Sequence, residues 1–326
     1  MGAAVERKKK LMMQARIPRS ERDRERRIIW AAMRASLEAS RYKYKRNGKK
    51  SRSHWTLFER LLSIFRVGLK ISGLYSKGEE NARQIQLEQK TFYFSALPEA
   101  FDGFRILHLS DFHIDSLSGH EDDIIKAIDP LEYDVAFLTG DYRKNISGSF
   151  KNILEPMKKI AGSMNPPFGI WATLGNHDSY LMAEYEEEVG INLIVNETLE
   201  LEKEGQTIYA TGTDDTYYYY SEQAVFALEK PIEGFKIALV HTGELRDVAA
   251  KNGYSLYLCG HTHGGQICLP GGKAILTHQY EGGEVIAGSW KYGEMQGYTN
   301  RGCGVSGIPV RFNCPPEVTL ITLKRK

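Results

Sequence analysis

The sequence predicts an α/β fold with layered β-sheets, preceded by a basic N-terminal arm. Within residues 90–326, short apolar runs typical of buried strands alternate with segments of helical periodicity. Additional strand-like runs indicate a second sheet packed against the first. Residues 1–77 differ from this body because they are polar and basic. We therefore expect an arm over residues 1–77 and one domain over residues 90–326.

Charge separates the arm from the body. The 326-residue chain carries 43 Lys/Arg and 41 Asp/Glu, but residues 1–77 hold 22 of these cations and only 6 of the acids. Such an excess of positive charge favours an anionic partner, either a lipid surface or a nucleic acid. Residues 1–53 are polar and strongly basic, so we expect them to be mobile or only marginally helical.

The segment 54–75 is predicted to form an amphipathic helix, because its apolar residues recur near helical spacing and charged residues occupy the other side. The apolar positions are Trp55, Phe58, Leu61, Leu62, Phe65, Leu69 and Ile71. Such a helix either lies flat in an anionic membrane interface or packs on the body. The following stretch "GEENARQ", residues 78–84, is expected to be a linker.

Cysteine usage and hydropathy indicate a cytoplasmic protein. Four cysteines are scattered through the C-terminal part without a C-x-x-C pair, which is typical of a reduced, intracellular setting. No stretch approaches the roughly 20 apolar residues that span a bilayer. Residues 1–14 lack the apolar core of a signal peptide. Any membrane contact of the arm would therefore be peripheral, at the inner face of the membrane.

Five short runs are predicted to be buried strands, because they are rich in Val, Ile, Leu and aromatic residues and each stops at a turn signal. These runs are residues 104–110, 134–140, 169–175, 235–241 and 254–260. Helical patterns between them cover residues 121–131, 149–164 and 180–190. The runs 205–212, 265–270 and 317–323 indicate the second sheet.

Metal-type ligands follow each of the five strands. Asp111 and His113 follow the first, Asp141 the second, Asn176, His177 and Asp178 the third, His241 the fourth, and His261 and His263 the fifth. Ligands of open α/β sheets bind beyond the carboxyl ends of the strands, so these side chains should converge in one crevice. A solvated loop would explain one His-x-His pair, but it does not explain five clusters at the same topological position.

In this order, the motifs D-x-H, G-D, G-N-H-D, H and G-H-x-H resemble the calcineurin-like metallophosphoesterase superfamily, from about Arg105 to His263. The stretches "GHTHGGQICLP" and "GVSGIPVRFNCPPEVTLITL" are similar to its bacterial branch of YkuE- and YaeI-type phosphodiesterases. The resemblance implies that residues 90–326 form a metallophosphoesterase catalytic domain. Its implied fold is a four-layer αββα sandwich of two mixed β-sheets, and its implied activity is metal-dependent hydrolysis of a phosphoric ester or diphosphate.

The resemblance also implies a site for two divalent metal ions. Asp111, His113 and His263 would hold one ion, Asn176, His241 and His261 the other, and Asp141 would bridge them. Two ions roughly 3.5 to 4 Å apart need an anionic bridge, and they turn a shared water into a hydroxide that attacks phosphorus. Nitrogen and oxygen ligands without a thiolate favour manganese first, with iron or zinc as alternatives.

Further residues near the motifs have expected roles. The resemblance gives His177 the place of proton donor or charge stabiliser at the leaving group, with Asp178 orienting its ring. Arg143 and Lys144 follow the bridging aspartate and either hold a second phosphate or are solvated loop charges.

Two other features leave packing and functional roles open. The tyrosine run 217–220 either walls the pocket or packs in the core. Cys259 lies beside the histidine loop but outside the motif, and we expect it to be a small buried residue rather than a ligand.

The basic arm and the amphipathic helix favour a membrane-bound substrate over a soluble one. The leading hypothesis is a diphosphatase of a lipid-linked substrate at the membrane surface, such as UDP-2,3-diacylglucosamine in lipid A biosynthesis, a role that some members of this bacterial branch have. The alternative is a general phosphodiesterase or phosphatase on soluble substrates. A nuclease is disfavoured by the acidic body, and an inactive scaffold is disfavoured by the complete ligand set.

Overall fold

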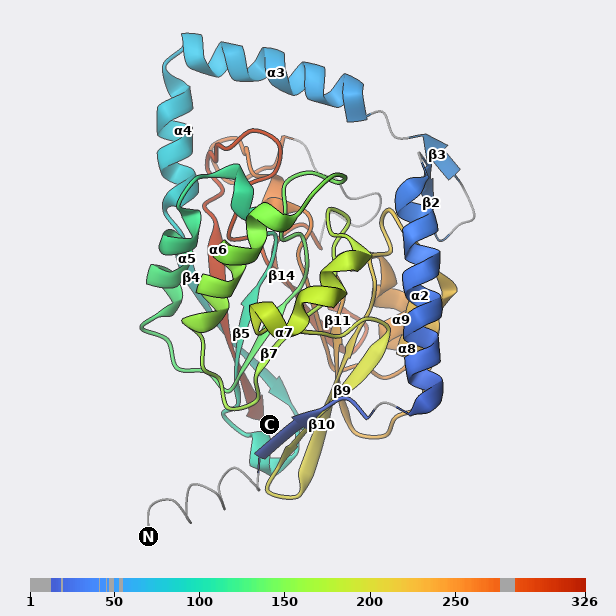
Figure 1. The fold of residues 1–326 in the computed structure, drawn as a ribbon. Helices are drawn as coiled ribbons and strands as arrows, with labels where there is room; N and C mark the ends of the chain where they lie inside the picture. The colour runs from blue at the N-terminus through green and yellow to red at the C-terminus, as the bar shows by residue number, and fades with distance from the viewer. Residues whose placement is uncertain are drawn as a thin grey trace.

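Two β-sheets pack face to face between outer helices in the computed structural model, which describes residues 13–18, 20–40, 42–44, 46, 50–52, 55–275 and 285–326 (Figure 1). The six-stranded sheet has the order β4 (Gln86–Phe94), β15 (Glu317–Arg325), β5 (Arg105–Leu109), β6 (Val135–Leu138), β7 (Ile170–Ala172) and β8 (Asn192–Leu193). The seven-stranded sheet has the order β1 (Met13–Arg16), β9 (Glu197–Lys203), β10 (Gln206–Gly212), β11 (Phe235–Leu239), β12 (Leu256–Cys259), β14 (Met295–Thr299) and β13 (Gly288–Tyr292).

Helices complete the four layers. They are α2 (Glu21–Ala39), α3 (Trp55–Ile71), α4 (Leu74–Arg83), α5 (His120–Ile128), α6 (Lys151–Gly162), α7 (Glu186–Val189), α8 (Glu222–Glu229) and α9 (Arg246–Lys251), and a separate hairpin is formed by β2 (Tyr42–Tyr44) and β3 (Lys50–Arg52). Apolar side chains of both sheets form the central core, among them Phe137 and Ile237. Helices α5 and α6 pack on the outer face of the six-stranded sheet, and α8 and α9 on that of the seven-stranded sheet. The predicted αββα sandwich of two mixed sheets is therefore confirmed.

The five predicted strands are present, but they are divided between the two sheets. Strands β5, β6 and β7 run parallel in one sheet, and β11 and β12 run parallel in the other. The prediction assigned all five to one sheet, because strand propensity does not reveal which neighbour a strand pairs with. The run 317–323 joins the first sheet as β15, while 265–270 forms only isolated bridges at Ile267 and Cys268.

Part of the N-terminal arm is integrated into the body, which corrects the expectation of a mobile or marginally helical segment. Strand β1 pairs antiparallel with β9 at the edge of its sheet. Helix α2 begins with a capping box formed by Ser20 and Asp23, and its buried Trp30 donates the indole N–H to Asp214. Tertiary burial thus stabilises a helix that is expected to be only marginally stable in isolation. Residues 1–12 of the predicted arm lie outside the described residues.

The predicted amphipathic helix 54–75 corresponds to α3 and the start of α4, apart from residue 54, which lies outside the described residues. Leu62 and Leu69 pack against Ile308 and Val310 of the C-terminal loop. The expected linker "GEENARQ" is instead helical, because α4 continues to Arg83 with its Gly78 and Ala82 positions buried. Among the described residues, no helix combines the length and apolarity needed to cross a membrane.

Candidate active site

The nine predicted ligand-type residues lie buried where β5, β6, β7, β11 and β12 end. They are Asp111, His113, Asp141, Asn176, His177, Asp178, His241, His261 and His263. Backbone hydrogen bonds join the loops after neighbouring strands, for example from Asp111 N–H to Gly140 O at 2.9 Å. A carboxylate joins the two sheets, since His261 N–H donates to Asp111 Oδ2 at 2.9 Å. The structure therefore brings all five clusters together at one end of the sandwich.

Several of these residues have a left-handed backbone conformation. The φ angles are 51° at Asp111, 36° at His113, 60° at Asp141, 72° at His261 and 51° at His263. Residues other than glycine adopt this region at a cost, and such residues concentrate at functional sites. Each sharp reversal directly after a strand keeps the side chain inside the crevice.

Two glycines let the loops approach these carboxylates. A Cβ at Gly260 would overlap Ser110 Oγ and Asp111 Oδ2, and a Cβ at Gly175 would overlap Asp141 Oδ1. Any larger residue at either position would displace a carboxylate of the site. The glycine before His261 is therefore a packing requirement as well as a turn.

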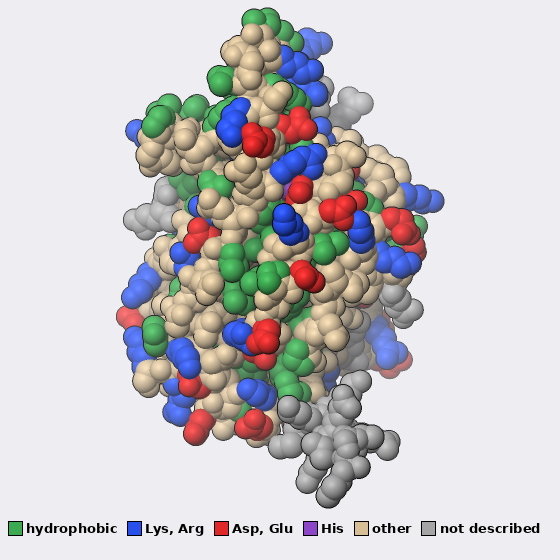
Figure 2. Space-filling view, turned by 90° about the vertical axis from the view of Figure 1, so that its left-hand side faces the viewer, with side chains coloured by type: hydrophobic (Ala, Val, Ile, Leu, Met, Phe, Trp, Pro, Cys, Tyr) green, Lys and Arg blue, Asp and Glu red, His purple; other side chains and the backbone are tan. Residues whose placement is uncertain are grey.

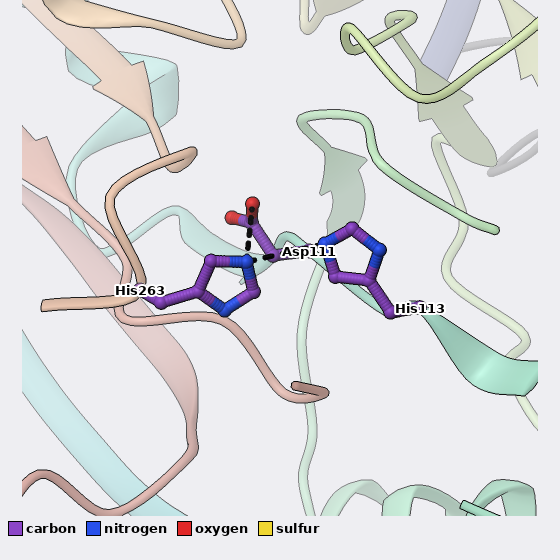
Figure 3. A group of neighbouring side chains, drawn as sticks. All are labelled: Asp111, His113 and His263. Atoms are coloured by element: carbon purple, nitrogen blue, oxygen red, sulfur yellow. Dashed lines mark hydrogen bonds and ion pairs between the residues drawn. The ribbon is translucent and has the colours of Figure 1, made fainter. Parts of the chain in front are cut away.

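The first cluster consists of Asp111, His113 and His263 (Figure 3). The Nε2 atoms of His113 and His263 are 3.1 Å apart, and their rings face each other in Figure 3. The His263 Nε2 atom lies 3.4 Å from Asp111 Oδ1. Two imidazole nitrogens and one carboxylate oxygen thus converge on one point, which is the donor set of a divalent cation.

The second cluster consists of Asp141, His241 and His261. The Asp141 Oδ2 atom lies 3.3 Å from His241 Nε2 and 3.6 Å from His113 Nε2 of the first cluster. His241 Nε2 lies 3.3 Å from His261 Nδ1. Asp141 therefore faces both clusters, as its predicted bridging place requires.

Asn176 tests whether a cation fits here. Its carboxamide oxygen is buried and accepts no hydrogen bond from the described residues. Buried polar atoms are almost always paired, so an orphaned buried oxygen in the loop that also carries His177 marks a missing electropositive partner. The residues present therefore fit divalent ions, and the predicted allocation of ligands between two ions stays a prediction.

Backbone carbonyls fix the direction of two ligand rings. The Nδ1–H of His113 donates to Arg143 O at 2.8 Å, and that of His241 donates to Thr139 O at 2.6 Å. Each contact places the lone pair of a neutral ring on Nε2, the atom that faces the cluster. Both rings are thereby held in the tautomer that binds a metal ion.

Burial and neighbouring charges shift the pKa values of the ligand-type residues in opposite directions. Burial lowers the pKa of His113 to about 4, with a further contribution from His177, so its ring is neutral. Burial opposes protonation of His241, but the carboxylate of Asp141 outweighs it and raises the pKa of that ring to about 10. Burial and the neighbouring Asp141 raise the pKa of Asp111 to about 7. A cation that binds here therefore replaces protons.

His177 and Asp178 lie at the site with different partners from those predicted. The Nε2 of His177 is 4.0 Å from Asp141 Oδ2, and its Nδ1–H donates to Lys144 O. The carboxylate of Asp178 instead accepts the backbone N–H groups of Asp141, Tyr142 and Gly175. Asp178 thus holds two loops together, and the Lys144 carbonyl orients the His177 ring.

Arg143 and Lys144, which were both predicted near the substrate, lie in different environments in the structure. The Arg143 guanidinium is buried and donates to the carbonyls of Ile146, Gly148 and His177, so it braces a loop rather than facing a second phosphate as predicted. The half-buried Lys144 side chain keeps its predicted role as a proposal.

The tyrosine run and Cys259 are packing residues. Tyr217, Tyr218 and Tyr219 are buried in one cluster, and the Tyr217 ring lies 4.3 Å from the His261 ring, centroid to centroid. Cys259 is fully buried on β12, as expected of a small core residue.

Arg311 is a residue near the site that sequence reasoning did not find. Its fully buried guanidinium donates to backbone carbonyls on both sides of the first cluster, including Gly304 O at 2.7 Å and His263 O at 3.3 Å. It therefore ties the His263 loop to the C-terminal loop. The stretch 304–323 signals family resemblance, but nothing local in it marks this arginine, because its partners are backbone groups distant in sequence.

Comparison with known proteins identifies the family. Residues 104–265 match the family model described as calcineurin-like phosphoesterase. The chain is 32% identical over 251 residues to the metallophosphoesterase YkuE of Bacillus subtilis (strain 168), covering 74% of this chain and 86% of that protein. It is 31% identical over 238 residues to the phosphodiesterase YaeI of Escherichia coli (strain K12), covering 68% and 82%. The solved structure of the phosphopantetheinyl hydrolase PptH from Mycobacterium tuberculosis superposes with a TM-score of 0.40 at 10% identity, over 61% of this chain and 89% of that one. The chain belongs to the calcineurin-like metallophosphoesterase family of metal-dependent phosphoester hydrolases.

Proposed function

We propose that this hydrolase uses two metal ions, manganese first among the candidates, to cleave a phosphodiester or diphosphate bond of a lipid-linked substrate such as UDP-2,3-diacylglucosamine. The observation that carries the two-metal centre is the pair of ligand clusters facing the single Asp141 carboxylate. When bound, the ions supply Lewis-acid activation of water and neutralise charge on the phosphoryl oxygens.

The chain's own residues supply positioning and proton transfer. The Asp141 Oδ1 atom accepts a hydrogen bond from the backbone N–H of His177 at 2.8 Å. This contact directs the Oδ2 atom of Asp141 toward the two ligand clusters. His177 lies beside His113, with 4.8 Å between ring centroids, and its Nε2 faces the crevice. In our proposal this ring delivers the proton to the leaving oxygen. In the same proposal, the half-buried Lys144, whose carbonyl orients the His177 ring, contacts the second phosphate of a diphosphate through its side chain.

An exposed apolar surface supports a substrate in a membrane. Helix α3 and the first residue of α4 expose Ile64, Phe65, Val67, Ile71 and Leu74, here named the α3 apolar surface. Arg66 and Lys70 lie on the same helix and are exposed. In Figure 2, apolar and basic side chains adjoin at the top of the molecule, where α3 meets α4. Apolar residues beside cations are typical of helices that bind anionic interfaces, so we propose peripheral membrane binding here.

The substrate assay uses the full-length protein with Mn²⁺ and UDP-2,3-diacylglucosamine in mixed micelles. We expect release of UMP and a lipid monophosphate, and absence of both products contradicts the lipid-linked substrate. In anionic vesicles, the variant Ile64→Glu with Ile71→Glu should lose most activity on the lipid but keep its rate on a small aryl phosphodiester. Phe226→Glu, which alters an exposed apolar residue on α8, is the matched control and should retain both activities.

A second candidate is a phosphodiesterase of soluble substrates, favoured by the similarity to YaeI, which is described as a phosphodiesterase. In that case the variant Ile64→Glu with Ile71→Glu would have wild-type activity on all phosphodiesters that the protein hydrolyses. Soluble phosphodiesters would also be hydrolysed faster than the lipid diphosphate.

A further inference from the structure

The C-terminal half of helix α2 contacts the loop that carries Asn176 and His177. Arg34 of this helix is only 1% exposed. Its Nη2 atom donates to Gly175 O at 3.1 Å and to Asp178 O at 3.0 Å. These two carbonyls belong to the residues on either side of the Asn176–His177 pair, so one guanidinium spans the base of the loop.

Arg34 is itself fixed from several sides. Its Nη1 forms a buried ion pair with Asp214, and its Nε donates to Glu38 Oε1 at 3.0 Å. The guanidinium carbon lies 3.6 Å from the centre of the Tyr219 ring. The indole N–H of Trp30, one turn earlier on α2, donates to the same Asp214 at 2.7 Å. A planar fork held in this way presents its remaining donors in one direction.

Glu38 extends the contact to the next residues of the loop. Its Oε1 accepts the Tyr180 N–H at 2.8 Å, and its Oε2 accepts the Ser179 hydroxyl at 2.8 Å. Two side chains one helical turn apart therefore hold the backbone from residue 175 to residue 180. The family match begins at residue 104, so neither side chain belongs to the matched region.

We propose that α2 is a positioning element of the active site, in which Arg34 and Glu38 hold the loop so that Asn176 faces its metal ion and His177 faces the leaving group. The inference rests on the proposed two-metal chemistry. The oxygen of Asn176 accepts no hydrogen bond from the described residues, so its direction depends on the loop backbone. Small displacements of positioned groups cost large factors in rate, about 10²-fold for 1 Å.

Arg27 separates positioning from simple attachment of the helix. It lies two turns before Arg34 on α2 and pairs with Glu186 and Glu197 of the body. Neither partner belongs to the loop of residues 175–180. Arg27→Gln therefore weakens the attachment of α2 without removing a contact to Asn176 or His177, which makes it the matched control.

The test compares Arg34→Lys, Glu38→Ala and Arg27→Gln in the full-length protein. Three quantities are measured: Mn²⁺ affinity and stoichiometry by calorimetric titration of metal-free protein, amide hydrogen exchange of residues 175–180, and kcat and KM on bis(4-nitrophenyl) phosphate. For Arg34→Lys we expect one of two ions to bind at least tenfold more weakly, faster exchange confined to the loop, and kcat about tenfold or more lower with little change in KM. Glu38→Ala should change each quantity in the same direction, and Arg27→Gln should change none.

Wild-type metal affinity, loop exchange and kcat in Arg34→Lys and Glu38→Ala would overturn the inference. Equal losses in Arg27→Gln would also overturn it, because they would reveal a general effect of helix attachment. If Arg34→Lys does not fold, Glu38→Ala decides alone, since the Glu38 side chain is partly exposed and its removal leaves the buried Arg34–Asp214 ion pair in place. A wild-type protein that binds fewer than two ions would instead contradict the proposed function and is recognised before any variant is compared.

Discussion

At the scale of single residues, the proposed two-metal centre depends on one carboxylate that faces both ligand clusters. Asp141 follows β6, its Oδ1 accepts a backbone N–H, and its Oδ2 faces imidazoles of both clusters. Burial alone would raise the pKa of Asp141, but His241, His177 and His113 together hold it well below its usual range. Asp141 is therefore an anion at neutral pH, as its proposed bridging role requires.

Protons and cations compete at the remaining ligands. In the metal-free protein the pKa of Asp111 is about 7 and that of His241 about 10, so both groups carry protons at pH 6. At pH 8, Asp111 is largely ionised while His241 still holds its proton. We expect Mn²⁺ affinity to rise from pH 6 to pH 8, by about tenfold per pH unit for each proton displaced.

Calorimetric titration in buffers of different ionisation enthalpy measures both the affinity and the protons released. Proton release on Mn²⁺ uptake at pH 7 supports these pKa shifts. An affinity independent of pH, without proton release, would show that the ligands are already deprotonated or lie outside the site.

Residue types could be predicted from the sequence more readily than their partners. The motif order predicts Asp111, His113 and His263 as ligands of one ion, and the structure places the three side chains together. The partners of Arg143 and Asp178 could not be predicted, because they are backbone groups of loops whose shape depends on the whole fold. Side-chain type indicates what a residue can bind, and the fold decides what lies within reach.

At the scale of elements, α2 is a helix whose docking on the body could not be predicted from hydrophobic periodicity. Nine of its 19 residues are charged, so pattern and composition favour a mobile arm. The helix is nevertheless anchored by a few large side chains, Trp30 and Arg34 among them, that bury against partners distant in sequence. By contrast, α5 and α6 have regular apolar stripes and could be predicted from the sequence.

The anchoring of α2 can be measured through Trp30. Trp30→Ala removes a buried indole from the core, and we expect the free energy of unfolding to fall by about 3–5 kcal/mol. Ile28→Ala on the same helix is the control, since Ile28 is 71% exposed and its loss should change stability by at most ~0.5 kcal/mol. Urea denaturation measures both. Equal stability of the two variants would mean that the arm is detached in solution.

At the scale of the whole molecule, the active site lies where two sheets meet. Strands β5 to β7 bring Asp111, Asp141 and Asn176 from one sheet, and β11 and β12 bring His241 and His261 from the other. Strand runs and their polar ends could be predicted, but not the division between sheets, which is set by packing across the central core. The site is therefore a product of the sandwich rather than of either sheet.

The most direct test is an anomalous diffraction experiment on crystals of the protein soaked with Mn²⁺, with Asp141→Asn as the comparison. We predict two manganese peaks about 3.5–4 Å apart that share Asp141 in the wild type. We also predict loss of at least one peak in the variant, because the neutral carboxamide cannot offset the repulsion of two cations. A single peak in the wild type, or two peaks that do not share Asp141, would contradict the proposed two-metal centre.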